Sequence, residues 1–369
     1  MKKIIKYEGY EFVVDLNNPV ARFADNPIIT PEDVNKIWRE PHRKVMTVHN
    51  AGIARFNNEI VMLFRSHLRS GVSVLGLARS KNGLTSWDIA KEPALMPCHE
   101  SDLFAKGKDK QRLIENEAGG VEDPRISLID DTYYITYSAY HGLLRDRVRV
   151  SLSTTMDFKK YTRYGEVMDM DMRNVVLFPE KINGKFVALM RPNDDSSSGH
   201  TGGSFKEIRI AYSDDLKSNV WHINPEPVMK QEGGPSAFAD KIGPGAPPLK
   251  SKYGWIQIFH GVRSTMDGNP YVLGVAFHDL NNPEKVMVSG IPILFPLQAD
   301  CRVKENDYIH VPQVVFTCGA IRNNDGTVLI YYGGNDTVMN VAVSHEDVLY
   351  ALCEKYPQEP LTGQPLYKL

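Results

Sequence analysis

Apolar and polar positions along the chain form one recurring unit: an apolar strand-like run, a short polar turn, and a second run rich in apolar and aromatic residues. Short runs of this kind bounded by turn residues are typical of β-hairpins. Long amphipathic helical patterns are scarce, so a parallel α/β fold is not expected. The unit recurs at residues 51–65, 124–140, 175–191, 246–262 and 318–336. The pattern therefore predicts an all-β chain built from five similar units.

The turns inside the units share their chemistry and their spacing. Each contains residues that tolerate a positive φ in a short hairpin. The turn pairs are Asn57-Asn58, Asp130-Asp131, Asn183-Gly184, Tyr253-Gly254 and Asp325-Gly326. Successive turns lie 73, 53, 70 and 72 residues apart, which leaves room for the four strands of a propeller blade. We predict a five-bladed β-propeller formed by residues 1–369 as a single domain; a β-sandwich or several unrelated hairpins is the alternative.

Two segments have helical character. Residues 31–43, PEDVNKIWREPHR, are expected to cap or extend the first blade. Residues 345–357 place the apolar side chains of Val348, Leu349 and Leu352 at helical spacing. This second segment predicts a short C-terminal helix that closes the chain.

Composition narrows the class of protein. The 369 residues are 42% apolar and 24% charged, the ordinary mix of a soluble globular protein, and the formal net charge is −2. This balance argues against nucleic acid or an anionic membrane as partner. The N-terminus lacks the continuous apolar region of a signal peptide, and no stretch approaches the roughly 18 apolar residues of a membrane span. Together with four scattered cysteines, these features predict a cytoplasmic protein.

Polar residues fall at corresponding places in the repeats. The second strand of a unit ends in, or is soon followed by, a residue that is costly to bury, and the segment entering the first strand is polar in the same way. The residues at these places are Asn50, Arg65, Asp123, Arg173, Arg191, Lys241, His260 and Asp336. Because equivalent strand ends of all blades converge on one mouth of a propeller, we expect these side chains to surround one pocket. For any one of them, a rim position or an inter-blade salt bridge is the alternative.

The expected pocket is strongly basic for a protein of nearly neutral charge. Arg65, Arg173, Arg191, Lys241 and His260 would repel one another unless an anion neutralises them. Planar guanidinium groups suit a tetrahedral oxyanion such as phosphate, and a lysine adds a point charge. Because the chain has neither a Walker A motif nor a dinucleotide glycine fingerprint, free phosphate or a phosphosugar is the expected anion.

Asp123 lies in the run NEAGGVEDPRI. Gly119 and Gly120 allow a close backbone approach, and Pro124 restricts the chain after the carboxylate. A carboxylate at such a corner can act as an acid, a base or a metal ligand, although no metal-ligand spacing is present. A local salt-bridge cluster of Glu122, Asp123 and Arg125 is the alternative.

Five segments together resemble glycoside hydrolase family 130. They are GGVEDPRI, RNVVLFPEKINGKFVALMRP, KIGPGAPP, IFHGV and IYYGGND, and the resemblance runs from about Asn50 to Asp347. The family includes β-mannoside phosphorylases, which are five-bladed propellers. Two segments depart from the family pattern: HNAG stands near the N-terminus where FNPG-like versions are more familiar, and GHTGGSFKEIR has no counterpart that we recognise.

The resemblance implies a role for each candidate residue. It implies Asp123 as the proton donor, Asn50, Arg65 and Asp336 as ligands of the mannosyl unit, and Arg173, Arg191, Lys241 and His260 as phosphate ligands. The implied reaction is inverting phosphorolysis of a β-mannoside (β-mannosyl-glucose, β-mannobiose or a mannooligosaccharide) to α-mannose 1-phosphate and a shortened sugar. Inorganic phosphate is then a co-substrate, with no other cofactor and no metal, and a homo-oligomer is expected.

Two other functions stay open at this stage. One is a β-mannosidase on the same fold, with Glu122, Glu180 or Asp336 activating water. The other is a non-catalytic glycan-binding propeller. If Asp123 is the acid, it must be protonated near neutral pH, so we expect it in a less polar setting than its charged neighbours suggest.

Overall fold

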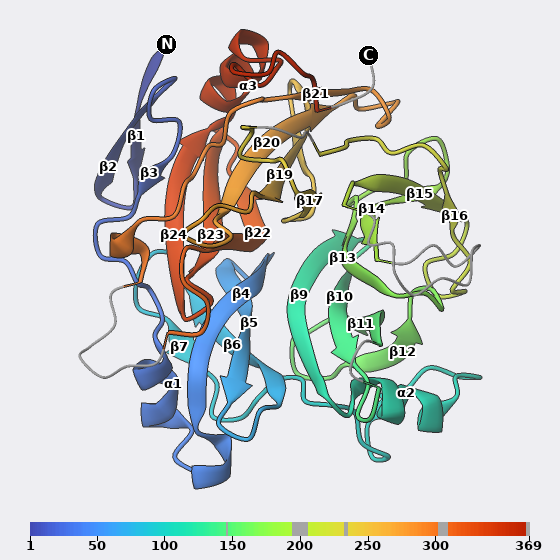
Figure 1. Ribbon diagram of the computed structural model, residues 1–369. Coiled ribbons are helices and arrows are strands. Elements are labelled where there is room, and N and C mark those ends of the chain that lie inside the picture. The colour runs from blue at the N-terminus through green and yellow to red at the C-terminus, as the bar shows by residue number, and fades with distance from the viewer. Residues whose placement is uncertain (145–146, 194–205, 232–234, 302–308, 367–369) are drawn as a thin grey trace.

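Five sheets of mainly antiparallel strands surround a common axis in the computed structural model, which describes residues 1–144, 147–193, 206–231, 235–301 and 309–366 (Figure 1). The sheets follow one another along the chain. The prediction of an all-β, five-bladed propeller is confirmed. Among the residues given above, no helix has the length and apolar composition of a membrane span.

Each blade begins with its innermost strand and runs outward. Blade one contains β4 (Val45–Phe56), β5 (Glu59–Leu68), β6 (Ser73–Ser80) and β7 (Asp88–Ile89). Blade two contains β9 (Gly120–Ile129), β10 (Thr132–Tyr140), β11 (Val148–Thr155) and β12 (Thr162–Glu166), with β8 (Leu103–Phe104) added in parallel to β12. Blade three contains β13 (Met172–Leu177), β14 (Phe186–Pro192), β15 (Arg209–Ser213) and β16 (His222–Ile223).

The last two blades depart slightly from this plan. Blade four contains β17 (Lys241–Pro244), β18 (Leu249–Ser251), β19 (Gly254–Val262), β20 (Tyr271–His278) and β21 (Val286–Val288). Its inner edge is divided between β17 and β18, because the intervening Pro247 and Pro248 have no backbone N–H to donate. Blade five contains β22 (Val315–Arg322), β23 (Thr327–Gly334) and β24 (Val338–His345).

The N-terminal part of the chain completes blade five. The short strand β3 (Ala21–Arg22) pairs with β24, so the fourth strand of the last blade comes from the beginning of the chain. Arg22 also forms an ion pair of 2.6 Å with Asp300, which is buried and accepts a hydrogen bond from Tyr332. This pairing closes the ring of blades.

The expected turn chemistry holds in three blades and only in part in the other two. Both residues have positive φ at Asn57-Asn58, Asp130-Asp131 and Asn183-Gly184. In blades four and five, however, only Gly254 and Gly326 do so. The expectation for Tyr253 and Asp325 was therefore wrong, because a single glycine is enough to turn those hairpins.

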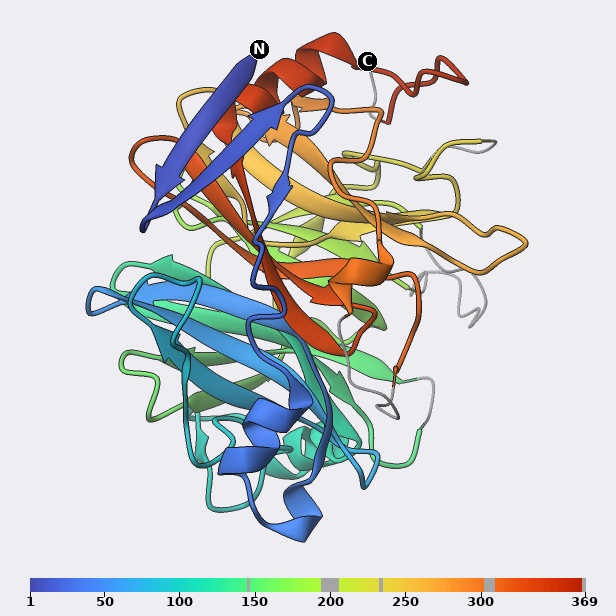
Figure 2. The ribbon, with the colours of Figure 1, turned by 90° about the vertical axis from the view of Figure 1, so that its left-hand side faces the viewer.

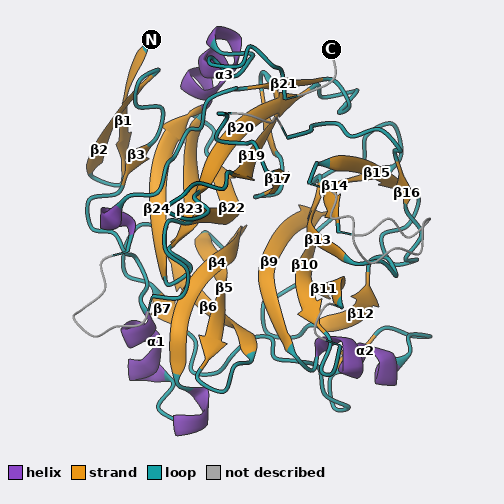
Figure 3. Cartoon of the chain, in the orientation of Figure 1, coloured by secondary structure: helices purple, strands orange, loops and turns teal. Residues whose placement is uncertain are grey.

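The short helices lie at the periphery of the propeller (Figure 3). The expected helical segment near the N-terminus forms α1 (Pro31–Ile37) and a 3₁₀ turn, η1 (Pro41–Arg43). The expected C-terminal helix is α3 (Glu346–Lys355), and its apolar face, Val348, Leu349 and Leu352, is fully buried. Both predictions are confirmed. The sequence reading did not anticipate α2 (Lys110–Glu117) or the 3₁₀ turn η2 (Gln298–Asp300).

A hairpin of β1 (Lys2–Tyr7) and β2 (Tyr10–Asp15) lies outside the five blades. Figure 2 shows it beside α3. Lys3 of β1 forms an ion pair of 2.7 Å with Asp347 of α3, which fastens the start of the chain to its last helix.

Candidate active site

One cavity at the axis receives side chains from all five blades. Its volume is about 250 Å³, and every one of the eight candidate residues lines it. The full lining is Asn50, Arg65, Glu122, Asp123, Tyr140, Arg173, Asn174, Arg191, Lys241, His260, Tyr271, Val311, Val314, Phe316 and Asp336. The prediction that these strand ends converge is confirmed, although the role of each residue remains a prediction.

Breaks in the innermost strands aim several of these side chains at the axis. The pairing register shifts next to Asn50 in blade one, Asp123 in blade two and Asn174 in blade three. These three residues have φ of 49°, 52° and 57°, a region in which Asn and Asp are enriched. A bulge redirects a side chain and occurs often beside active sites. The repeat therefore places an amide, a carboxyl and an amide at the same level of three blades.

Asp123 lies in a charged setting. Its Oδ1 accepts hydrogen bonds from Asn50 Nδ2 at 3.0 Å and Arg65 Nη1 at 3.2 Å. Arg65 Nη2 donates to Glu122 Oε1 at 2.8 Å, so one guanidinium joins both carboxylates. The expectation of a less polar setting for Asp123 was wrong, because residues from blade one supply two donors that are distant in sequence.

Arg125 takes no part in the local salt-bridge cluster that the sequence left open. Its Nη1 donates to the backbone oxygen of Asp123 at 2.9 Å and its Nε to that of Gly245 at 2.9 Å. Its Nη2 donates to Asn174 Oδ1 at 2.8 Å. One buried guanidinium thus ties blades two, three and four together, and Arg65 is the cation that pairs with Glu122 and Asp123.

Three further lining residues are cations, and they are called the cationic half of the cavity below. Arg173, Arg191 and Lys241 make no ion pair with any residue of the described ranges. The Arg173 guanidinium lies 5.6 Å from the ring centroid of Tyr140, and Lys241 Nζ lies 5.0 Å from that of Tyr271. Aromatic faces attract such cations but do not neutralise them.

The crowding of charge shows in the pKa values of two of these cations. Burial, with the nearby Arg173 charge, lowers the pKa of Arg191 to about 10. Burial, with the charges of Arg191 and Arg173, lowers the pKa of Lys241 to about 8. An anion bound in the cavity would raise both pKa values again, because it stabilises the charged form of each side chain.

His260 does not contribute a positive charge. It is fully buried, and burial together with Arg191 and Lys241 lowers its pKa well below the usual value. Its ring packs against Phe316 at a centroid distance of 4.5 Å, and in the part of the chain that the structure describes neither ring nitrogen has a hydrogen-bond partner. Counting His260 among the cations was therefore wrong, while its proposed contact with phosphate stays a prediction.

Asp336 is the carboxyl with the least polar surroundings. Burial raises its pKa to about 7, and although Arg65 opposes this change, Asp123 and Glu122 add to it. Its backbone has φ of 47°, and its Oδ1 has no hydrogen-bond partner within the described chain. An unpaired buried acceptor is costly, which is consistent with a group that awaits a donor from a ligand.

Sequence reasoning gave no role to six lining residues: three with a polar group, Asn174, Tyr140 and Tyr271, and the apolar Val311, Val314 and Phe316. Asn174 had a detectable signal, because it stands at the same place in its repeat as Asn50 and Asp123. Tyr140 is the last residue of the second repeat unit, but an aromatic residue at the end of a strand is ordinarily expected in the hydrophobic core. Tyr271 begins β20, beyond the repeat unit, and no sequence pattern marks it.

Glu180 lies outside the site. It forms an ion pair of 2.7 Å with Lys250, and about half of its side chain is exposed. It does not line the central cavity, so the suggestion that it activates water there was wrong. Within the described ranges, no group of three His, Cys, Asp or Glu side chains is placed to hold a metal ion.

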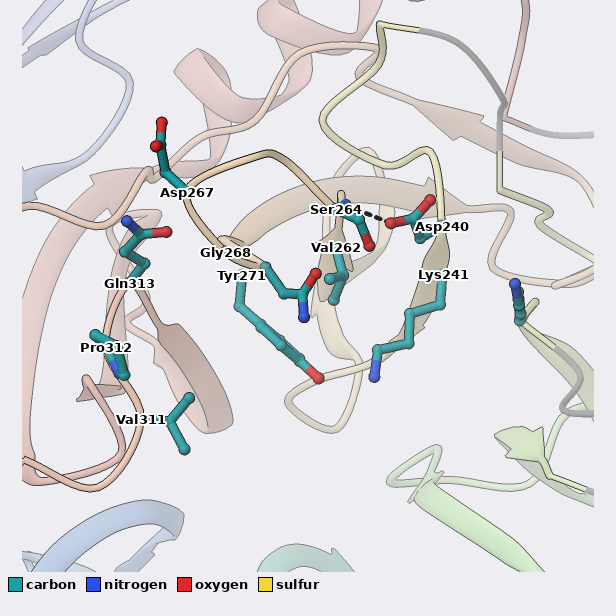
Figure 4. A pocket seen from close by; sticks show the side chains of 12 residues that line it. Asp240, Lys241, Val262, Ser264, Asp267, Gly268, Tyr271, Val311, Pro312 and Gln313 are labelled. Carbon is teal, nitrogen blue, oxygen red and sulfur yellow. Dashed lines mark hydrogen bonds between the residues drawn. The ribbon is translucent and has the colours of Figure 1, made fainter.

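A second cavity of about 620 Å³ adjoins the cationic half. It shares Lys241, Tyr271 and Val311 with the central cavity and is otherwise lined mainly by exposed polar residues. Figure 4 shows the polar ends of Lys241 and Tyr271 next to each other in this space. The second cavity therefore connects the cations to solvent.

Comparison with known proteins gives concordant matches. The model of glycoside hydrolase family 130, described as β-1,4-mannooligosaccharide phosphorylase, matches residues 17–355. A β-1,2-mannobiose phosphorylase of Thermoanaerobacter sp. (strain X514) is 37% identical over 89% of this chain and 98% of its own length. A 1,2-β-oligomannan phosphorylase of the same strain is 33% identical over 88% of this chain and 96% of its own.

A solved structure agrees with these sequence matches. The β-1,2-mannobiose complex of a Listeria innocua β-1,2-mannobiose phosphorylase superposes with a TM-score of 0.73 and 27% identity. The match covers 91% of this chain and 99% of the other.

Proposed function

The chain belongs to glycoside hydrolase family 130, and from this premise we propose that it cleaves a β-mannoside with inorganic phosphate to give α-mannose 1-phosphate and a shortened sugar. One observation carries the proposal: three cations without an acidic partner among the described residues line the same small cavity as the carboxyl of Asp123. A buried cluster of like charges is unfavourable unless a ligand neutralises it. Phosphate has the charge and the geometry to do so.

The division of the cavity suggests where each substrate binds. The mannosyl unit occupies the half that contains Asn50, Arg65 and Asp336, where amide, guanidinium and carboxyl groups can bond sugar hydroxyls. Phosphate occupies the half that contains Arg173, Arg191 and Lys241, and the second cavity provides its route from solvent. His260 Nε2 or Nδ1 can add a neutral hydrogen bond there.

The reaction follows as a single displacement. A phosphate oxygen forms a bond to the anomeric carbon while the bond from that carbon to the glycosidic oxygen breaks. Asp123 gives a proton to the departing oxygen, and the configuration at the anomeric carbon inverts. An inverting hydrolase needs a second carboxylate to activate water, whereas phosphate already carries the nucleophilic charge. Three cations at the nucleophile's place therefore favour phosphorolysis over hydrolysis.

We propose β-1,2 as the linkage that is cleaved. Two relatives at 33% and 37% identity are named for β-1,2-mannosides, and the solved relative contains β-1,2-mannobiose. The description of the family model names a β-1,4 linkage instead, so linkage must be tested directly.

Product analysis tests both parts of the proposal. The enzyme is incubated with β-1,2-mannobiose or β-1,4-mannobiose, with and without phosphate, and mannose 1-phosphate and free mannose are measured separately. We expect mannose 1-phosphate only when phosphate is present and faster turnover of the β-1,2 isomer. Free mannose formed at an undiminished rate without phosphate would reject phosphorolysis and favour the β-mannosidase alternative.

A further inference from the structure

A network of hydrogen bonds leads from His67 through Ser73, Glu122 and Arg65 to Asp123. Ser73 Oγ is 3.1 Å from His67 Nδ1 and donates to Glu122 Oε1 at 2.7 Å. The same Glu122 oxygen accepts from Arg65, whose other terminal nitrogen donates to Asp123. The chain therefore runs from blade one into blade two and ends at the carboxyl assigned as the proton donor.

Most of the side chains in this hydrogen-bond network are shielded from solvent. Ser73 is 1% exposed, and the side chains of Arg65, Glu122 and Asp123 are 12%, 11% and 16% exposed. Water therefore cannot readily replace a lost partner, and each hydrogen bond restricts the next group in the chain. A long guanidinium side chain has many rotamers, so its contact with Asp123 depends on what holds its other nitrogen.

The backbone is built to bring the two blades together at this point. Gly120 has φ of 134°, and a Cβ atom there would lie 3.0 Å from the backbone nitrogen of Ser73. A Cβ on Gly119 would lie 2.9 Å from the backbone oxygens of Tyr140 and His141. Gly120 therefore permits the close approach that lets Ser73 reach the Glu122 carboxylate, whereas Gly119 permits close packing within blade two.

We propose that Ser73 and Glu122 are positioning residues for the proton donor. This inference rests on the proposed function. Ser73 orients Glu122, and Glu122 in turn holds the Arg65 guanidinium. Arg65 then keeps the Asp123 carboxyl directed at the departing oxygen. Neither Ser73 nor Glu122 needs to touch the reacting atoms. Misplacement of a reacting group by about 1 Å can lower a rate by about 100-fold. Loss of one hydrogen bond in this network is therefore expected to slow the chemical step.

The test replaces Ser73 and compares it with a matched serine. Ser73→Ala removes the hydroxyl that holds Glu122. Ser66→Ala is the control, because Ser66 is equally buried in the adjacent strand β5 and its hydroxyl has no hydrogen-bond partner within the described residues. Both variants are assayed for kcat and for the KM of phosphate with the same mannobiose, and their thermal unfolding is recorded.

We expect kcat of Ser73→Ala to fall about 10-fold while the KM for phosphate stays within about 2-fold of wild type. Ser66→Ala should change neither by more than about 2-fold. Equal kcat values in the two variants, or a loss confined to the KM for phosphate, would overturn the proposal. A fall in kcat explained by partial unfolding of Ser73→Ala at the assay temperature would also count against it.

The outcome can be separated from failure of the proposed function. The requirement of the wild-type enzyme for phosphate decides whether the reaction is phosphorolysis. The ratio of kcat between Ser73→Ala and Ser66→Ala decides whether Ser73 positions the acid, and it can be measured in whichever cleavage reaction the wild type catalyses.

Discussion

Arg65 and Arg191 occupy the same place in blades one and three, but their charges are balanced in different ways. Each lies on the second strand of its blade, directly opposite the residue before a bulge: His49 for Arg65 and Arg173 for Arg191. Although burial opposes its charge, Glu122 and Asp123 raise the pKa of Arg65. Burial and Arg173 instead lower the pKa of Arg191 to about 10.

The difference shows how one repeated position can serve two purposes. In blade one the neighbouring blade supplies carboxylates, so the guanidinium becomes part of the protein's own structure and orients Asp123. In blade three the nearby charged side chains that act on Arg191 are cationic, and we propose that this guanidinium binds the phosphate. The repeat places an arginine at this position in both blades, whereas the charged groups around each arginine differ between the blades.

The largest effect on the rate of cleavage is expected from replacing Asp123, the carboxyl that Arg65 contacts. Asp123→Asn keeps an oxygen that can accept from Asn50 and Arg65 but cannot supply the proton. General acid catalysis contributes about 10²–10⁴ in rate, so release of mannose 1-phosphate should fall by about 1000-fold. Thermal unfolding serves as the control for folding. Turnover within about 10-fold of wild type would show that another group supplies the proton.

Replacing each arginine by methionine should affect the free energy of unfolding differently. Arg65→Met leaves Glu122 and Asp123 without their shared cation, and breaking a buried pair costs about 3 kcal/mol or more. Arg191→Met removes a buried charge that has no acidic partner in the described part of the chain, so the free energy of unfolding should be unchanged or higher. Urea denaturation without phosphate measures both variants.

The same pair of variants sharpens the comparison when phosphate is added. Phosphate should stabilise the wild type and lose most of this effect in Arg191→Met, because only the second arginine is assigned to the anion. If both variants lost stability equally, or if Arg191→Met kept the full effect of phosphate, the two arginines would not differ as described.

The cationic half should also respond to pH. Lys241 has a pKa of about 8, lowered by burial and then by Arg191 and Arg173, so it loses its charge as pH rises through 8. The KM for phosphate should therefore rise by about 5-fold between pH 8 and pH 9. Arg191→Met removes one neighbouring cation and should shift this rise to higher pH. A KM that stays flat to pH 9 in the wild type would contradict the expectation.

The smallest effect is expected at Asp336, on the carboxylate half. Its folded pKa, raised by burial to about 7, lies above that of an unfolded aspartate, so the carboxylate destabilises the fold increasingly between pH 4 and pH 7. Asp336→Asn removes this charge and should be more stable than the wild type by about 1 kcal/mol at pH 8, with little difference at pH 4. Unfolding curves at the two pH values test this. If Asp336→Asn and the wild type were equally stable at both pH values, the Asp336 charge would not destabilise the fold and the expectation would be wrong.

Much of the architecture could be predicted from local patterns. Hairpins such as residues 51–65 carry their own turn residues, and α3 carries its own apolar face. Elements without a local signal were missed: α2 is short and largely polar, and β3 is a two-residue strand whose place depends on pairing with β24 at the other end of the chain. The candidate residues were found because the repeat places them at corresponding positions.

By itself, the sequence determined the repeat, the hairpins and the set of polar residues at the strand ends, because strand periodicity and turn preference act over a few residues. Only the tertiary structure decided which of those residues are charged, paired or exposed. His260 is neutral, Arg65 is paired and Arg191 is not, since burial and Coulomb interactions depend on distances in space between blades. Residues that lie 57 or 58 positions apart in the chain, such as Arg65 and its two carboxylates, meet only when the ring of blades is assembled.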